Sequence, residues 1–223
     1  MKTPSNSFAF TFVDLLIVIF VLSVIIAIAP AFFARPHSKR LGCTNNLKQV
    51  GLAFRIWAGD NNDKYPMSVS VTNGGAMELA NEGSAHAIFM VMSNELCTPK
   101  ILYCPDESNR KREAATVFAT TAPPGVTPFT ATDNLSYFVG LDAEDTKPQT
   151  ILAGDDHFNV AGLKPKLGLL ALSTNALVEW RNERHPKQGN VCMADGSVQG
   201  FSTYAFRAAL IQTGIATNRL AMP

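Results

Sequence analysis

The sequence predicts an α+β protein in which a long N-terminal helix, membrane-spanning in its first half and amphipathic in its second, packs on an antiparallel β-sheet. Three observations predict this fold class. Residues 15–34 form an uncharged apolar run, apolar residues recur at helical spacing over residues 47–57, and short strand-like runs follow from residue 135. The length of 223 residues allows one ordinary domain beyond the first helix.

The apolar run contains only Ser23 and Pro30 outside the apolar residue types. At ~1.5 Å of rise per residue, residues 15–34 reach roughly 30 Å, about the hydrocarbon thickness of a bilayer. A secretory signal peptide carries a shorter apolar segment of ~7–15 residues. We therefore expect a transmembrane helix over residues 10–34, kinked near Pro30, in preference to a signal peptide or a buried core helix.

Asp14 places a carboxylate at the start of this run. A charge beside hydrocarbon is costly unless it is paired, so such a residue is a functional candidate. The string AFTFVDLL, which begins at Ala9, resembles the processing site of type IV prepilins and of the pseudopilins of type II secretion systems. In that family the residue before the cut is usually Gly and the carboxylate is usually Glu. Ala9 is still small, and Asp14 keeps the charge.

The resemblance implies a specific course of maturation. A prepilin peptidase removes a leader of residues 1–9 by cutting between Ala9 and Phe10, and the new N-terminus at Phe10 is methylated. During assembly Asp14 meets the α-amino group of a neighbouring Phe10, which neutralises two charges. The implied function is that of a structural pilin or pseudopilin subunit, without enzymatic activity, in a type IV pilus-like or type II secretion filament that serves protein transport.

The resemblance also implies a location and a set of partners. We expect a single-pass inner-membrane protein with a cytoplasmic N-terminus, an amphipathic helix continuation over residues 35–62 and a periplasmic globular domain over residues 63–223. The expected partners are the prepilin peptidase, other pilin or pseudopilin subunits and an inner-membrane assembly platform. Basic residues after the apolar run favour the opposite orientation by the positive-inside rule, but the processing site is the more specific signal.

Apolar residues at spacings of three and four predict a second helical segment with one apolar face. These residues are Leu47, Val50, Phe54 and Trp57. The polar residues after Gly59 end this segment. The string CTNNLKQVGLAFRIWAGDNNDKYP resembles a segment of planctomycete and verrucomicrobial pilin-like proteins. Its Asp60 and Asp63 raise the question of a calcium site, but the EF-hand order is absent, and a solvated turn is the preferred interpretation.

The C-terminal part has a β pattern. Short apolar or alternating runs predict strands over residues 135–139, 150–153, 167–172 and 176–181. Asp195-Gly196 lies between two alternating runs and predicts a hairpin over residues 190–202 with a type I′ turn. A last short helix is expected over residues 204–212, capped by Thr203. Residues 66–132 are less readable, and residues 85–92 fit a short helix or a buried strand equally.

His185, Asp195 and Gly196 form a His-x9-Asp-Gly pattern. It resembles the C-terminal signature of the same planctomycete and verrucomicrobial family, as Cys104-Pro105-Asp106 resembles a Cys-Pro-x-Asp element of that branch. We interpret these signature residues as structural. The alternative is a membrane-anchored periplasmic hydrolase or metal-binding protein that uses His185 with Asp195 or Asp155. The run Asp155-Asp156-His157 is interpreted as a solvated loop.

Composition and cysteine spacing narrow the range of ligands and functions that the sequence supports. Charged residues make up 17% of the chain and the net charge is +1, so there is no basic stripe for nucleic acid. No Cys-x-x-Cys pair and no Cys/His cluster at zinc spacing occurs, so we predict no metal, no cofactor and no catalytic residue. If the domain is exported, a disulfide is expected among Cys43, Cys97 and Cys104, with Cys192 interpreted as a small buried hydrophobic residue.

Overall fold

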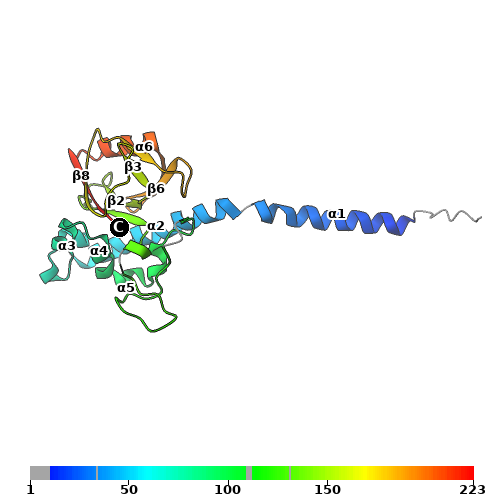
Figure 1. The fold of residues 1–223 in the computed structure, drawn as a ribbon, viewed down its shortest axis with the longest axis horizontal. Coiled ribbons are helices and arrows are strands. Elements are labelled where there is room, and N and C mark those ends of the chain that lie inside the picture. The colour runs from blue at the N-terminus through cyan, green and yellow to red at the C-terminus, as the bar shows by residue number, and fades with distance from the viewer. Residues whose placement is uncertain (1–10, 34, 109–111, 131) are drawn as a thin grey trace, which may run out of the picture. The chain divides into compact units, whose positions relative to one another are not determined.

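The computed structural model describes residues 11–33, 35–108, 112–130 and 132–223, except for the side chains of residues 27–33, 35–38 and 132. The leader over residues 1–9 and the cleavage pair Ala9 and Phe10 lie outside this range. The chain divides into two compact units, Met1–Lys39 and Arg40–Pro223. Figure 1 labels the main elements of both units.

The first unit contains helix α1, Phe12–Phe33. Its N-terminus is a capping box, because the Asp14 carboxylate accepts hydrogen bonds from Thr11 N (2.9 Å) and Thr11 Oγ1 (2.7 Å) while Thr11 Oγ1 accepts one from Asp14 N (3.3 Å). The two side chains thereby satisfy two backbone N–H groups that the first helical turn leaves without partners. Helix α2, Arg35–Asp60, begins in the same unit.

Several expectations about this region are wrong. Within the described part of the chain, no helix combines the length and the apolar character needed to cross a membrane. This finding overturns the transmembrane helix over residues 10–34 and the single-pass inner-membrane location. The prediction took the length and the absence of charge in residues 15–34 as sufficient for a membrane span.

The expected fold class is also corrected. In place of one long N-terminal helix, the structure has a helix-rich N-terminal part with α1 and α2 as separate elements, followed by a large antiparallel sheet that dominates the α+β fold. Most of α2 lies inside the second unit, which begins at Arg40. Burial of an apolar face against the sheet is what makes this helix part of the folded unit.

The buried face of α2 matches the predicted spacing. Its core side chains are Cys43, Leu47, Val50, Ala53, Phe54, Trp57 and Ala58. The helix approaches the sheet closely at Gly51, where an added Cβ would lie 2.6 Å from Cys192 Sγ. Only a residue without a side chain allows this approach. Residues 60–63 turn the chain, with Asn62 and Asp63 at positive φ.

Short helices connect α2 to the sheet. They are the α-helices α3 (Met77–Asn81), α4 (Ala85–Val91) and α5 (Ser93–Leu96), and the 3₁₀ helices Pro66–Ser68, Val71–Asn73, Pro99–Leu102 and Thr132–Asn134. Ser84 caps α4 by accepting a hydrogen bond from Ala87 N (3.2 Å). Residues 85–92, for which the sequence left helix and strand open, are thus mainly helical.

The main sheet has six strands in the order β4-β8-β1-β2-β6-β7, and every pairing is antiparallel. The strands are β1 (Tyr137–Gly140), β2 (Ile151–Asp155), β4 (Gly168–Ser173), β6 (Gln188–Met193), β7 (Val198–Ser202) and β8 (Thr217–Met222). A small second sheet pairs β3 (Phe158–Val160) with β5 (Val178–Trp180). Strands β3 and β8 were not among the predicted strands.

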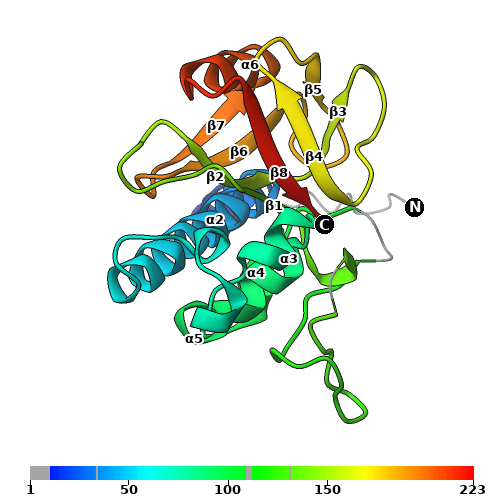
Figure 2. The same ribbon diagram turned by 90° about the vertical axis from the view of Figure 1, so that its left-hand side faces the viewer.

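The two faces of the main sheet bury two different cores. On one face, Tyr137, Val139 and Cys192 pack with α2 and the short helices. On the other face, Phe138 and Val191 pack with the small sheet and with helix α6, Thr203–Gln212. Figure 2 shows α2 to α5 on one side of the sheet and α6, β3 and β5 on the other. Alternate residues along β1 and β6 therefore serve opposite cores.

The predicted hairpin is present as β6 and β7, but its turn differs. Cys192 pairs with Val198, and Met193 N donates to Ser197 O (2.9 Å), so the loop has three residues. Among the described residues of this loop only Gly196 has positive φ, at 82°. A three-residue loop with one left-handed glycine matches the right-handed twist of the strands as well as a type I′ turn does. Ser202 caps α6 in place of the predicted Thr203.

Candidate functional site

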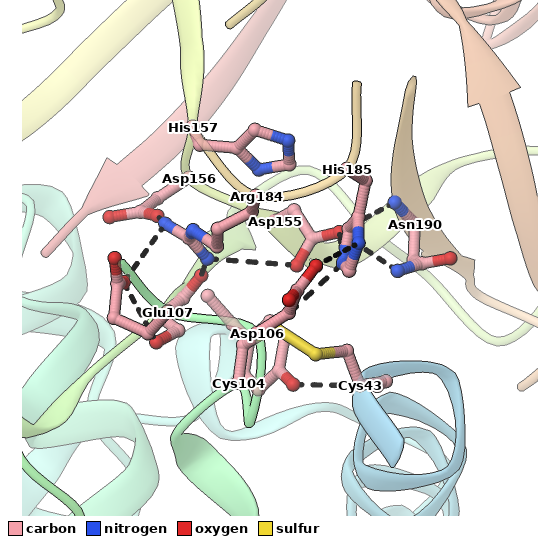
Figure 3. Close-up of polar contacts among 12 residues, drawn as sticks. Cys43, Cys104, Asp106, Glu107, Asp155, Asp156, His157, Arg184, His185 and Asn190 are labelled. Atoms are coloured by element: carbon pink, nitrogen blue, oxygen red, sulfur yellow. Dashed lines mark hydrogen bonds and ion pairs between the residues drawn. A yellow bond between two sulfur atoms is a disulfide. The ribbon is translucent and has the colours of Figure 1, made fainter. Parts of the chain in front are cut away.

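A cluster of charged side chains is buried where three separate segments meet. We call Glu107, Arg112, Asp155, Asp156 and Arg184 the buried ion cluster. Glu107 and Arg112 follow the 3₁₀ helix at residues 99–102, the two aspartates lie at the end of β2, and Arg184 precedes β6. Figure 3 shows Glu107, Asp155, Asp156 and Arg184 converging beside the disulfide between Cys43 and Cys104.

Arg184 lies at the centre of the buried ion cluster, with a side chain only 2% exposed. It pairs with the Asp156 carboxylate, lies 3.4 Å from Glu107 Oε2 and donates a hydrogen bond to Ser136 O (3.0 Å). Arg112 supports the same carboxylates, at 2.7 Å from Asp156 Oδ2 and 3.3 Å from Glu107 Oε2. Two guanidinium groups thus hold three protein segments together through shared carboxylates.

Burial sets the electrostatics of this arrangement. Loss of solvent lowers the pKa of Arg184 from its ordinary value, while Asp155 and Glu107 act in the opposite direction. Despite this lowered pKa, Arg184 stays protonated, as arginine does in proteins generally. Removing one partner from a buried ion cluster would leave a charge without compensation, at a cost of about 3–5 kcal/mol. The cluster therefore specifies how Glu107 and Arg112 pack against the sheet.

His185 lies next to the cluster and contacts three groups. Its Nδ1 lies 3.2 Å from Asp106 Oδ2, and its Nε2 lies 3.7 Å from Asp155 Oδ2 and 3.8 Å from Cys104 Sγ. Burial lowers the pKa of His185, and this effect exceeds the opposing influence of Asp155 and Asp106. The ring is therefore neutral at neutral pH.

Asn190 also holds the Asp155 carboxylate in place. Asp155 Oδ2 accepts hydrogen bonds from Asn190 N (2.7 Å) and from Asn190 Nδ2 (3.0 Å). Thr44 Oγ1 of α2 donates to Asn190 Oδ1 (3.1 Å), and the Arg40 guanidinium donates to the Gln188 side chain. The interpretation of residues 155–157 as a solvated loop is wrong, because each is buried and Asp155 and His157 are fully so.

The alternative hypothesis pairs His185 with Asp195, but the structure does not bring these two residues into contact. Asp195 lies in the exposed hairpin loop, where its Oδ1 accepts a hydrogen bond from Ser197 N (2.8 Å) and its carbonyl accepts one from Arg55 (2.7 Å). The Ser197 hydrogen bond lowers the pKa of Asp195. Asp195 and Gly196 form the hairpin turn, whereas His185 belongs to the buried region around Asp155.

Of the predicted cysteines, Cys43 on α2 and Cys104 form a disulfide that spans 61 residues of sequence. Cys97 is a free, exposed cysteine and Cys192 a free, buried one. The disulfide lies next to the Tyr137 phenol, which donates to Cys43 O (3.4 Å), and Asn46 of α2 donates to Tyr103 O (2.9 Å). Both contacts tie α2 to the rest of the unit independently of the sulfur bond.

The interactions available at this site serve to hold segments of the chain together. The side chains of His185, Asp155 and Arg184 are at most 2% exposed, so a substrate has little direct access to them. The two sulfur atoms are joined to each other and cannot act as nucleophiles. Asp106, whose side chain is 25% exposed, is the point at which the site meets solvent.

Sequence reasoning missed most of this site for a physical reason. The charged residues come from three stretches that each look like a polar loop when read alone, and burial follows only when arginines and carboxylates from different stretches pair. The nearest available signal was Arg184-His185 together with Asp155-Asp156-His157. The capping box of Thr11 and Asp14 was also missed, although Thr-x-x-Asp before an apolar run is a recognised N-terminal pattern.

Comparisons of the chain with protein-family models, with curated proteins and with solved structures found no match. Its function must therefore be argued from its own residues. Two features stand out for that argument: the exposed apolar helix α1 with its capped carboxylate, and the buried region around His185.

Proposed function

We propose that this chain is a pilin-like filament subunit that a prepilin peptidase cuts between Ala9 and Phe10 and that assembles through α1. The observation that carries the proposal is the exposure of α1. Every described side chain of residues 11–26 is exposed, from 43% at Val24 to 74% at Phe12 for the large apolar ones. A helix that is apolar all round is stable only when other elements enclose it.

Copies of the same helix are the occupants that fit α1 best. A partner with a single groove would cover one side of the helix and leave the other sides in water. A bundle of like helices buries all sides at once, because each α1 lies between several neighbours. Exposed apolar surface of this extent marks an interaction site. Assembly of many copies is the function that would bury the apolar surface around the whole circumference of α1.

Asp14 is the charged residue that such a bundle must accommodate. Its bonds from Thr11 lower the pKa of Asp14, so the carboxylate is ionised at neutral pH. Both of these bonds use Oδ2. The second oxygen can accept from the α-amino group of Phe10 in a neighbouring subunit, which exists only after the leader is removed. Pairing of the two charges removes the cost of enclosing either one alone.

Mass spectrometry of the protein from its native host tests the processing step. The expected N-terminus is a methylated Phe10. A chain that still begins at Met1 in cells with an active prepilin peptidase would contradict the proposal.

A second experiment separates helix capping from pairing between subunits. Thr11→Val removes the local cap but keeps the carboxylate, whereas Asp14→Asn keeps the side-chain shape but removes the charge. We expect Thr11→Val to enter filaments normally and Asp14→Asn to be excluded. If both variants assemble equally, Asp14 acts only as a cap. Asp14→Glu is the matched control, because it restores the charge and should assemble.

A further inference from the structure

Three metal-binding atoms from distant parts of the chain converge at the disulfide. Cys43 Sγ, Cys104 Sγ and a ring nitrogen of His185 all lie within 4.8 Å of one another, and all three residues are buried. His185 Nε2 is 3.8 Å from Cys104 Sγ. In a tetrahedral zinc site with Zn–S of ~2.3 Å and Zn–N of ~2.0 Å, a sulfur and a nitrogen ligand are roughly 3.5 Å apart. The observed spacing is close to this value.

Asp155 is the candidate for a fourth ligand, because its carboxylate faces the same ring nitrogen, Nε2, that faces Cys104 Sγ. Asp155 Oδ2 is 3.7 Å from His185 Nε2 and is held in place by Asn190 N and Asn190 Nδ2. Carboxylates that bind metals are typically oriented by hydrogen bonds of this kind. The other carboxylate oxygen, Oδ1, lies 3.8 Å from Arg184 Nη1.

The outer contacts of His185 also match those of a zinc ligand. The Asp106 carboxylate faces His185 Nδ1 at 3.2 Å. Histidines that bind zinc through one ring nitrogen usually offer the other N–H to a carboxylate, which fixes the tautomer with Nε2 free to bind. Within the described residues, Nδ1 is buried and makes no hydrogen bond of good geometry. A shift of the ring toward a metal at Nε2 is compatible with its contact to Asp106.

We propose that Cys43, Cys104, His185 and Asp155 bind Zn²⁺ when the disulfide is reduced. A dithiol reductant supplies two electrons and two protons, the S–S bond breaks to give two thiols, and the reductant forms its own disulfide. Binding of Zn²⁺ then releases the two thiol protons. Two Zn–S bonds, one Zn–N bond to Nε2 and one Zn–O bond to Asp155 form.

The surrounding structure keeps the ligands together without the sulfur bond. The hydrogen bonds from Tyr137 to Cys43 O and from Asn46 to Tyr103 O hold α2 against the Cys104 segment. Metal and disulfide are then alternative links between the same two segments. The zinc form clamps α2 in a chain whose cysteines have not yet been oxidised, and oxidation releases the metal.

A Co²⁺ titration of the full chain tests the proposal, with Co²⁺ as a spectroscopic probe for zinc. The parent carries Cys97→Ser, so that its exposed thiol cannot contribute. A mild detergent shields the apolar side chains of α1. After anaerobic reduction we expect one Co²⁺ per chain, with a thiolate-to-cobalt charge-transfer band and the d–d bands of a tetrahedral ion, both removed by Zn²⁺. The oxidised chain should show neither.

Variants show which residues bind the metal. We expect Cys43→Ser and His185→Gln each to weaken binding at least tenfold, and Asp106→Asn to weaken it by roughly tenfold. Cys192→Ala is the matched control, because it removes a buried thiol outside the site and should bind as the parent does. The proposal is overturned if the reduced parent binds no Co²⁺ or if Cys43→Ser binds as well as the parent.

A thermal measurement covers the case in which a variant fails to fold. The melting temperature of the reduced parent, followed by circular dichroism, should rise on addition of Zn²⁺ and should not rise for the oxidised parent. The absence of a rise in the reduced chain would overturn the proposal independently of any variant. Neither result bears on filament assembly, so this inference and the proposed function can fail separately.

Discussion

Gly51 of α2 lies directly against Cys192 of β6. A Cβ added at Gly51 would be 2.6 Å from Cys192 Sγ, and its next contacts would be Gly196 Cα and O at 3.5 Å. The sulfur atom is therefore the one close obstacle. This contact determines how closely the helix approaches the centre of the sheet, and the same approach brings Cys43 and Thr44 of α2 to Cys104 and Asn190.

The first prediction concerns this contact. Alanine at Gly51 gains ~1 kcal/mol of helix propensity, but overpacking against a sulfur atom costs about 1–3 kcal/mol. We expect Gly51→Ala to lower the free energy of unfolding in a denaturant titration. Gly59→Ala is the control in the same helix, because nothing lies within 4 Å of its added Cβ, and it should be neutral or stabilising.

A double-mutant cycle shows whether the sulfur atom is responsible. In the Cys192→Ala background the obstacle is absent, so Gly51→Ala should lose most of its cost. A coupling free energy of about 1–2 kcal/mol is expected for residues in direct contact. Additive effects of the two substitutions would mean that the helix is held close to the sheet by other contacts.

The second prediction concerns Arg184 in the buried ion cluster. Arg184→Met keeps much of the apolar stem but leaves Asp156 and Glu107 short of a positive charge in a buried place. We expect a loss of about 3–5 kcal/mol in the free energy of unfolding. The control is Arg219→Met, which breaks the pair with Asp142 at a position where the arginine side chain is 44% exposed. Exposed pairs contribute about 0–1 kcal/mol, and equal losses for the two variants would contradict a special role for the cluster.

Much of the second unit could be predicted from sequence. The spacing of Leu47, Val50, Phe54 and Trp57 predicted the buried face of α2, because a helix that packs on one side repeats its apolar residues every three to four positions. The positions of β6 and β7 followed from alternation around Asp195-Gly196. Such local patterns suffice where a single element decides which side chains are buried.

Other features depend on contacts between distant segments, and the sequence could not indicate them. Asp155 was interpreted as part of a solvated loop, and no local pattern in the sequence singled out Arg184. Their burial requires mutual neutralisation across the fold. The turn type at Asp195 depended on the loop length between the strands. The membrane prediction rested only on the length and the absence of charge in residues 15–34.

The third prediction concerns thiol reactivity. Burial raises the pKa of the Cys192 thiol to about 12, and the thiolate is the form that reacts with alkylating agents. A raised pKa means that little thiolate forms until the pH is strongly alkaline. Iodoacetamide at about pH 9 should therefore label the exposed Cys97 and leave Cys192 unmodified in the native protein. Peptide mass spectrometry identifies the labelled site.

Denaturation provides the control for this labelling. In denaturant without a reductant, Cys192 should become labelled while the disulfide keeps Cys43 and Cys104 protected. Rapid labelling of Cys192 in the native state would show that α2 separates from the sheet often enough to admit the reagent, since local opening controls access to buried groups.

The last prediction is a pH dependence at the hairpin turn. Hydrogen bonding from Ser197, first from its side chain and then from its backbone N–H, lowers the pKa of Asp195 below its ordinary value in the folded state. The unfolded chain therefore takes up a proton at higher pH than the folded chain does. The stability that this group contributes is fully present above about pH 4, the ordinary range of aspartate, and is lost as the pH falls through the folded pKa.

Asp195→Asn isolates this contribution, because the amide does not titrate and its oxygen still accepts from Ser197 N, although less strongly than a carboxylate does. We expect the variant to be less stable than the parent near neutral pH, with the difference in the free energy of unfolding shrinking as the pH is lowered below about 4. Urea titrations of both proteins across this range measure the difference directly. A difference that stays constant with pH would mean that the substitution acts through turn geometry and that the charge of Asp195 contributes nothing to the hairpin.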